Sequence, residues 1–421
     1  MVIAAFLLII LALIGAPLFT VIAAGGIVAS FSADISPDIL IIEMHRLSAS
    51  PNMLAIPLFT FAGVMMSSGG APQRLVSFYR AAFGWMPGGF AIVAIGSCAF
   101  FTTFSGASGV TILALGGLLY PILKNEGYKE KFTLGLLTTS GSLGLLFPPS
   151  LAIIIYAIIS GVSIEQIFLA GIVPGVLLMV MLAIYSMVHG TKNHIVRHGF
   201  DLKILFTAIK DSIWDLFLPF GVVIGIFGGF VSIMEAATVT AAYIIILEVL
   251  VYKTINLKKQ FVFLLVETCV LFGSLLAILM VALGLTNLMI DAELPMKMLQ
   301  AIEKHISSPL QFLMLLNLFL LLVGAMMDIF SAIIVVVPLI LPIALLYGID
   351  PVHLGIIFLA NLEIGYSTPP VGINLFIASQ RFGKNVVTLF KSTLPYLLIM
   401  FLWLLMVTYI PELSLWWKQD S

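Results

Sequence analysis

Charged residues are scarce in this chain. Only 9% of its 421 residues are Asp, Glu, Lys or Arg and 61% are hydrophobic, whereas soluble domains carry about 25% charged residues. So few charged side chains cannot cover the water-exposed surface of a soluble protein of this length. Continuous apolar stretches recur from end to end, and each is long enough to cross the roughly 30 Å hydrocarbon layer of a bilayer. The composition therefore predicts an all-α polytopic membrane protein.

Three further absences narrow the function. The formal net charge is −1, so no basic field attracts nucleic acid. The two cysteines, Cys98 and Cys269, lie inside apolar segments, and no disulfide is predicted. The histidines lie in polar breaks or at segment ends, which disfavours the buried Ser–His pair of an intramembrane hydrolase. Such a hydrolase is a remote alternative, and we expect no enzyme activity, cofactor or transition metal.

Apolar runs separated by polar breaks outline the membrane segments. The chain opens on an apolar run without a charged leader or a cleavage site, and we treat this run as a retained span. No long soluble loop is present, so a soluble partner has to be another chain. Amphipathic pieces near 72–84, 201–211 and 294–304 are predicted to lie at the membrane surface. The predicted membrane segments are 1–31, 52–68, 87–123, 131–160, 165–189, 213–230, 236–251, 260–290, 308–347, 350–380 and 386–411.

Four of these segments are irregular. Segments 87–123 and 308–347 are too long for one helix and contain a break, so each is predicted to form a re-entrant helical hairpin. Segments 131–160 and 350–380 each contain a Pro-Pro pair, which frees backbone carbonyl groups. A membrane tolerates free carbonyls only where they are buried in protein or line a cavity. Each Pro-Pro segment is therefore predicted to be a broken transmembrane helix beside a cavity.

The order of segments is the same in both halves of the chain. Each half has two spans, an amphipathic piece, a hairpin, a broken helix and a final span, and an odd extra crossing between the halves turns the second one over. We therefore predict two inverted repeats, 1–195 and 236–421, joined by an amphipathic piece and a linking helix within 196–235. Paired interrupted segments at corresponding positions are the best sequence pointer to the binding site of a transporter.

Loop charge predicts the orientation. By the positive-inside rule, the first hairpin opens from the cytoplasm, the second opens from the outside, and the C-terminus lies outside. The side of the N-terminus stays open. We interpret the clustered His189, His194 and His198 as part of a solvated cytoplasmic loop rather than a metal site. The basic loops are 124–131, 189–211, 253–259 and 381–391, and the loops without Lys or Arg are 161–165, 231–235 and 347–353.

The four breaks bring together groups that suit ion binding. Free carbonyls and Ser/Thr hydroxyls supply the several oxygens that a hard cation such as Na⁺ needs, and the N-termini of half-helices suit an anion. We predict one cation site in each half, with an anion between them. The alternative is that the small residues at the breaks serve only helix packing.

Two carboxylates are interpreted as lying away from segment ends. Asp328 falls at the break of the second hairpin, and Glu363 lies two residues before Gly365. A charge at bilayer depth is costly and usually functional. The alternatives are a helix cap for Asp328 and a buried structural hydrogen bond for Glu363.

Four stretches resemble the large, DctM-type membrane subunit of TRAP (tripartite ATP-independent periplasmic) transporters. The resemblance covers nearly the whole chain, and the PPS and TPPVG motifs are specific. It implies an elevator-type, sodium-coupled importer of a small organic anion in the bacterial inner membrane, working with a small four-helix membrane subunit and a periplasmic substrate-binding protein. A stand-alone sodium–anion symporter is the alternative. The stretches are MLAIPLFTFAGVMMSSGG (53–70), GWMPGGFAIVAIGSCAFFTTFSGASG (84–109), LGLLFPPSLAIIIYAIISGVSIEQIFLAGIVPGVLL (143–178) and GIDPVHLGIIFLANLEIGYSTPPVGINLFIAS (348–379).

The resemblance, together with the breaks, indicates the site residues. The family usually reads GSSVAT at the first hairpin, where this chain has Ala107 in place of one hydroxyl; a sulfonate or dicarboxylate ligand is the suggested consequence. We expect sodium site 1 at Ser105, Gly106, Ser108, Gly144, Pro148 and Pro149. We expect sodium site 2 at Gly324, Ser331, Gly365, Thr368 and Pro369. The expected substrate residues are Ala107, Thr111, Ser150, Asp328 and Asn374.

Overall fold

The computed structural model consists of helices joined by turns and loops in the part of the chain that it describes, which comprises residues 6–8, 10, 11, 18–33, 35–48, 51–193, 195, 199–292, 306 and 308–418. This confirms the predicted all-α class. Within these residues, six helices are long and apolar enough to cross a membrane, or seven if one bent pair is a single span. This number is smaller than the number of predicted segments, because several apolar helices are shorter than a full span. The short ones include Phe19–Ser32, Ala55–Ser68, Gly89–Ser105 and Pro351–Gly365.

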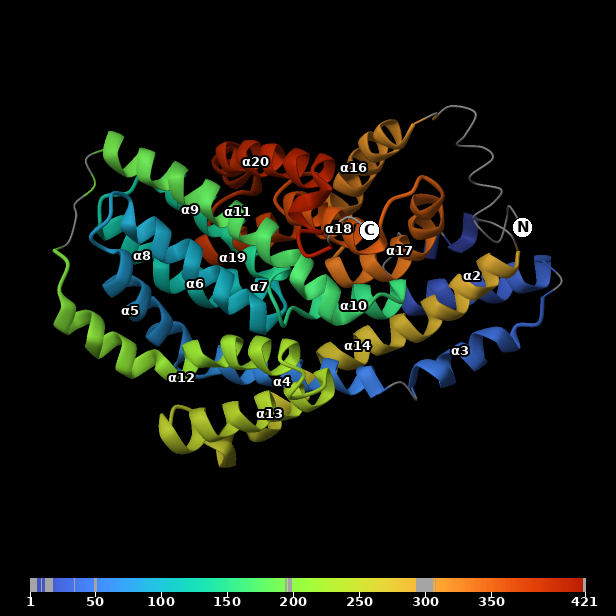
Figure 1. The fold of residues 1–421 in the computed structure, drawn as a ribbon, viewed down its shortest axis with the longest axis horizontal. Helices are drawn as coiled ribbons and strands as arrows, with labels where there is room; N and C mark the ends of the chain where they lie inside the picture. Colours follow the sequence, from blue (N-terminus) through green and yellow to red (C-terminus); the bar gives the residue numbers. More distant parts are fainter. Residues whose placement is uncertain are drawn as a thin grey trace.

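One group of helices forms a layer along one side of the molecule, which we call the framework layer (Figure 1). The long helix α14 packs against α2, α3 and α4, and α13 packs against α4 and α12. The members of this layer are α2 (Leu18–Ala33), α3 (Asp38–Ser48), α4 (Ala55–Ser68), α12 (Leu202–Phe227), α13 (Ile233–Ile245, continued by the π-helical η4, Ile246–Val251) and α14 (Leu257–Asp291).

The remaining elements, apart from α5 (Ala71–Phe83) and the short turn η1 (Pro51–Leu54), form a second group, which we call the hairpin layer. Its first half comprises α6 (Gly89–Ser105), α7 (Ser108–Thr111), the π-helical η2 (Ile112–Gly116), α8 (Gly117–Asn125), α9 (Glu130–Ser140), the 3-10 turn η3 (Leu143–Leu146), α10 (Leu151–Ser160) and α11 (Ile164–Lys192). Its second half comprises α16 (Pro309–Met326), α17 (Ile329–Leu346), α18 (Pro351–Gly365), α19 (Ile373–Phe382), α20 (Val386–Tyr409) and the short turn η5 (Pro411–Leu413).

The contacts in the hairpin layer come in matching pairs. α6 packs against α9 and η3, and α16 packs correspondingly against α18. Beyond each helix break, α10 packs against α17 of the other half, and α19 packs against η2 and α7. The final helices also cross over, since α11 contacts α18 and α20 contacts α9. Several contacts therefore have a counterpart in the other half, although the packing of α6 against α11 has no counterpart of similar extent between α16 and α20.

Helix α5 (Ala71–Phe83) connects the layers, because it contacts α6 on one side and α12 on the other. It corresponds to the predicted amphipathic piece 72–84, and it buries Leu75 and Val76. The predicted amphipathic piece 201–211 is continuous with the predicted linking helix, because α12 runs without interruption from Leu202 to Phe227. No glycine or proline occurs before Pro219 to end the helix. The predicted piece 294–304, His194 and His198 lie outside the described residues.

Candidate functional site

The first hairpin turns at Gly106, as its break predicts. α6 ends at Ser105, and Gly106 adopts a left-handed conformation with φ 64° that favours glycine. A Cβ atom on Gly106 would also lie 2.7 Å from Leu151 Cδ1. The chain then resumes a helix at Ser108. Glycine is therefore required here both by the backbone conformation and by the close approach of α10.

The second hairpin turns at Met327 and Asp328. Asp328 caps α17, since its Oδ2 atom accepts hydrogen bonds from the N–H groups of Phe330 and Ser331, both at 3.0 Å. The helix-cap interpretation of Asp328 is therefore confirmed. The capping contacts occupy only Oδ2, and the same residue also lines two cavities.

The tips of the two hairpins meet at these two cavities. The framework cavity, of about 230 Å³, lies where the tips face α4 and α14, and its lining includes Ser105, Ala107, Asp328 and Ser331. The hairpin cavity, of about 310 Å³, is lined by residues of both tips and of α19, including Gly106, Ala107, Ser108, Asp328 and Tyr366. Sequence reasoning missed Thr60 of α4 and Ser274 of α14 in the framework cavity, because no break marks these helices.

The first broken helix packs closely on the first hairpin. A Cβ atom on Gly144 would collide with backbone atoms of α6 at Ala99 and Thr103. Thr102 Oγ1 lies 2.8 Å from the Gly141 carbonyl oxygen, and Thr103 Oγ1 donates to the Gly144 carbonyl at 3.3 Å. Two threonine hydroxyls and two carbonyl oxygens thus gather here. The prediction missed Thr102 and Thr103, although both lie within one turn of the Gly106 break.

The helix pair α9/η3 and α10 bends by 46° at the predicted Pro-Pro break. The peptide bond between Pro148 and Pro149 is cis, as is that between Pro369 and Pro370. Ser150, directly after the first break, is fully buried and its hydroxyl has no hydrogen-bond partner among the described residues.

The second broken helix is attached to the second hairpin through its backbone. The N–H groups of Val371 and Gly372 both donate to the Ala325 carbonyl oxygen, at 3.1 and 2.9 Å. The Thr368 hydroxyl donates to the Ile364 carbonyl at 2.9 Å. Thr368 and Pro369 line neither of the two cavities, whereas Ser331 lines the framework cavity. The residues expected for sodium site 2 are thus neighbours of the same break, but they do not surround one cavity.

The expected substrate residues fall into two groups. Ala107 and Asp328 line both cavities. Thr111, Ser150 and Asn374 line neither and are fully buried. Thr111 Oγ1 lies 2.7 Å from Thr102 Oγ1, and Asn374 Nδ2 donates to the Thr138 carbonyl at 3.3 Å. Thr111 and Asn374 therefore make buried hydrogen bonds to neighbouring helices and do not line the cavities.

The interpretation of the intramembrane carboxylates requires correction. Glu363 is fully buried, but neither of its carboxyl oxygens has a hydrogen-bond partner among the described residues, so the alternative of a structural hydrogen bond is wrong. Asp215 and Glu248 are also fully buried, within α12 and η4. Asp328 and Glu363 are therefore not the only acids away from segment ends.

Asp215 and Glu248 share one cation, Arg74 of α5. Arg74 Nε and Nη2 donate to Asp215 at 2.6 and 2.7 Å, and Nη2 donates to Glu248 at 2.5 Å. Glu248 also accepts from the Gly70 N–H group at 3.2 Å and from the Thr254 hydroxyl. This buried ion cluster ties the start of α5 to the framework layer.

Comparison with known proteins assigns these features to a family. The family model of the tripartite ATP-independent periplasmic transporter, DctM component, matches residues 2–413. The C4-dicarboxylate TRAP transporter large permease protein DctM of Vibrio cholerae is 35% identical over 386 residues, which is 86% of this chain and 85% of the relative. The isethionate TRAP transporter permease protein DctMQ of Oleidesulfovibrio alaskensis is 33% identical over 404 residues, 95% of this chain and 62% of the relative. These relatives are permeases and not enzymes.

The fold has a counterpart among solved structures. The YdaH transporter of Alcanivorax borkumensis matches 89% of this chain and 88% of its own chain with a TM-score of 0.63 and 14% sequence identity. At this identity the likeness concerns the fold alone.

Proposed function

The chain belongs to the DctM component family of tripartite ATP-independent periplasmic transporters, and on this basis we propose that it imports a small organic anion by sodium-coupled secondary active transport. The observation that carries the proposal is the meeting of the two hairpin tips, which come from different halves of the chain and share the lining residues Ala107 and Asp328 in both cavities. Secondary transporters commonly place their substrate and ion sites where such interrupted segments meet, which supports the proposal.

The substrate that we propose is a small carboxylate or sulfonate. The framework cavity of about 230 Å³ is smaller than the roughly 300–1,000 Å³ of pockets for drug-sized ligands. Thr60, Ser105, Ser274 and Ser331 line it. The hydroxyls of Thr60, Ser105 and Ser274 donate to backbone carbonyls, so these three must rotate before they can donate to an anionic oxygen. The C4-dicarboxylate and isethionate relatives transport anions of these two kinds, which supports the proposed class.

Two sodium ions, one at each break, are the proposed coupling ions. The carboxylate of Asp328 repels an anion in the same cavity unless a cation offsets its charge. Oxygens that can bind sodium gather at the Gly141 and Gly144 carbonyls near the first break, and at Ser331 and Thr368 near the second. Glycine and proline at the breaks act by freeing carbonyl groups rather than by supplying charge.

Transport is proposed to proceed by an elevator movement of the hairpin layer against the framework layer. The contacts that recur in both halves support a repeat, and the proposal takes the two repeats to be inverted, with a re-entrant hairpin in each. α5, which contacts both layers, acts as an arm between the moving and fixed parts. We place the protein in the bacterial inner membrane with a periplasmic C-terminus.

Two partners belong to the proposal. A periplasmic binding protein delivers the anion, and a small four-helix membrane subunit packs on the framework layer. The DctMQ relative, of which this chain matches 62%, supports a second membrane component. Large apolar side chains exposed on α12, such as Phe206, Phe217 and Phe220, give such a subunit an apolar face.

Uptake into proteoliposomes tests the proposal. The chain, reconstituted with its small subunit, is assayed with a panel of radiolabelled dicarboxylates and sulfonates, with and without the periplasmic binding protein, under an inward sodium or choline gradient. We expect uptake only with sodium and the binding protein together. Uptake without the binding protein supports the stand-alone symporter instead, and uptake that is equal in choline excludes sodium coupling.

A further inference from the structure

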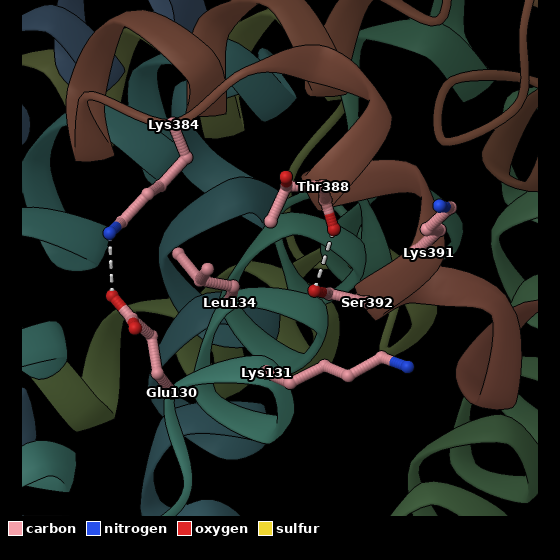
Figure 2. Close-up of a pocket in the computed structure, with 7 residues that line it drawn as sticks. All are labelled: Glu130, Lys131, Leu134, Lys384, Thr388, Lys391 and Ser392. Carbon is pink, nitrogen blue, oxygen red and sulfur yellow. Dashed lines mark hydrogen bonds and ion pairs between the residues drawn. The ribbon is translucent and has the colours of Figure 1, made fainter.

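A separate cavity opens between the starts of α9 and α20, away from the hairpin tips (Figure 2). Its volume is about 290 Å³, and seven residues from these two helices and the loop before α20 line it. Both helices begin here, α9 at Glu130 and α20 at Val386. The loops that precede them are among the basic loops of the sequence. The lining residues are Glu130, Lys131, Leu134, Lys384, Thr388, Lys391 and Ser392.

The charge of this lining is positive and only partly balanced. Three lysines and one glutamate give the lining a charge of +2. Lys384 pairs with Glu130 at 2.9 Å, and Figure 2 shows the Lys384 side chain turned toward that carboxylate. Lys131 and Lys391 end on the other side of the cavity, and within the described ranges neither has an ion-pair partner. Two lysine ammonium groups are therefore available to an anion.

The backbone around the cavity adds to its preference for anions. Two helix N-termini meet here, and a helix N-terminus carries a partial positive charge. The helices then converge, because Gly135 of α9 allows the Ser392 carbonyl of α20 to approach its backbone. The Tyr396 hydroxyl of α20 also donates to the Phe132 carbonyl of α9 at 3.0 Å. These contacts hold the two helices together beside the cavity, which we call the wedge.

An apolar stripe continues from Lys391 along the outer face of α20. Val387, Leu394, Leu398 and Leu402 are all exposed, and Leu398 is 67% exposed. Val387 lies one turn before Lys391, and the other three follow it at intervals of three or four residues, which places all of them on one side of the helix with Lys391. A molecule with an anionic head and apolar tails matches this arrangement, whereas a soluble anion uses only the lysines.

We propose that this wedge binds the head group of an anionic phospholipid. The phosphodiester lies between Lys131 and Lys391, and the acyl chains run along the exposed stripe of α20. Basic pockets between transmembrane helices on the cytoplasmic side are suited to anionic lipid head groups. Because α9 and α20 come from different halves of the chain, the bound lipid also bridges the two halves.

To test this proposal, lipid is titrated into the purified full-length chain in detergent, and the midpoint of thermal unfolding is measured at each lipid concentration. The additives are dioleoylphosphatidylglycerol, dioleoylphosphatidylcholine and glycerol 3-phosphate. We expect phosphatidylglycerol to raise the midpoint of the original chain. The lipid concentration that gives half of this rise should increase about fivefold in Lys131→Gln or Lys391→Gln, and about fivefold again when both lysines are replaced. Phosphatidylcholine and glycerol 3-phosphate should have little effect, because the first lacks net charge and the second lacks acyl chains.

Matched variants distinguish the loss of a specific binding site from a general loss of positive charge. The double variant Lys258→Gln/Lys259→Gln removes the same charge from exposed positions on α14 and should bind the lipid like the original chain. Lys131→Arg/Lys391→Arg keeps the charge and should retain binding, which controls for folding of the glutamine variants. Equal lipid response in the Lys131→Gln/Lys391→Gln and Lys258→Gln/Lys259→Gln chains would overturn the proposal. An equal response to glycerol 3-phosphate would show that the ligand is a soluble phosphate ester rather than a lipid.

Discussion

Gly324 and Gly365 pack backbone against backbone. A Cβ atom on Gly365 would lie 2.6 Å from Gly324 Cα and 2.8 Å from Ala325 N. The contact joins the end of α16 to the end of α18, and it lies beside the Ala325 carbonyl that accepts hydrogen bonds from Val371 and Gly372. The second hairpin and the second broken helix are thus held together through main-chain atoms at the proposed sodium site.

Gly365→Ala should destabilise this junction. The added methyl group has no space between two backbones, and overpacking of this kind costs about 1–3 kcal/mol. We expect a lower midpoint of thermal unfolding in detergent and weaker sodium-dependent uptake. Gly273→Ala is the control, because a Cβ atom there meets nothing within 4 Å and alanine favours a helix. Equal stability of the two variants would contradict the backbone contact.

Thr368→Val should raise the sodium concentration required for half-maximal uptake. The substitution keeps the side-chain shape and removes one oxygen, and each 1.4 kcal/mol of lost ion binding corresponds to about a tenfold change. Thr268→Val removes a hydroxyl with the same kind of bond, from Oγ1 to the Leu264 carbonyl at 2.8 Å, but in α14, and it should leave sodium dependence unchanged. If Thr368→Val, Ser105→Ala and Ser108→Ala all kept normal sodium dependence at normal expression, the two-site scheme would have to be abandoned.

Substitutions of Asp328 should distinguish its role as the cap of α17 from its role as a negative charge near the proposed ions. Asp328→Asn retains an oxygen that can cap α17, so stability should change little, while uptake should fall because the charge near the ions is lost. Asp328→Ala also removes the cap, at a cost of about 0.5–2 kcal/mol in the free energy of unfolding. Asp350→Asn, at the cap of α18, is the matched control, for which we expect near-normal uptake. Normal uptake by Asp328→Asn would limit Asp328 to a structural role.

Arg74→Gln should strongly destabilise the protein. The change leaves Asp215 and Glu248 buried without their cation, and breaking a buried ion pair from one side costs about 3–5 kcal/mol. Arg80→Gln on the same helix is the control, because Arg80 is exposed and loses its contact with the Phe90 ring, 5.5 Å from the ring centroid, which costs about 0.5–1 kcal/mol. The two unfolding midpoints, measured in the same detergent, provide the comparison. Similar midpoints would show that the cluster does not hold α5 in place.

Local chemistry made the helix breaks predictable. Gly106 and the two Pro-Pro pairs interrupt helices through their backbone properties, Asp328 begins α17 through its cap, and the structure has breaks at each of them. The repeated order of segments also predicted, in outline, that the breaks of the two halves lie close together. The pairing of α10 with α17 could not be predicted, because it depends on packing between residues that are distant in sequence.

The residues that the sequence analysis missed lacked a clear signal in the sequence, for different reasons. Asp215 is the third residue of the predicted segment 213–230, and Glu248 is the fourth from the end of 236–251. The argument that singled out acids away from segment ends therefore did not reach them. Their shared partner Arg74 could not be identified, since the predicted surface position of 72–84 suggested solvent around it. Thr60 and Ser274 carry no signal in the sequence. A single hydroxyl in a regular apolar helix most often bonds to its own backbone.

Ala107, Asp328 and Phe330 belong to the walls of both cavities. A ligand that shifts one of these residues therefore alters the free energy of binding in both cavities at once. Linkage makes this effect reciprocal: if an occupant of one cavity tightens binding in the other tenfold, the second occupant tightens the first tenfold, a coupling of about 1.4 kcal/mol. A shared wall thus makes the occupancies of the two cavities interdependent without any long-range signal through the fold.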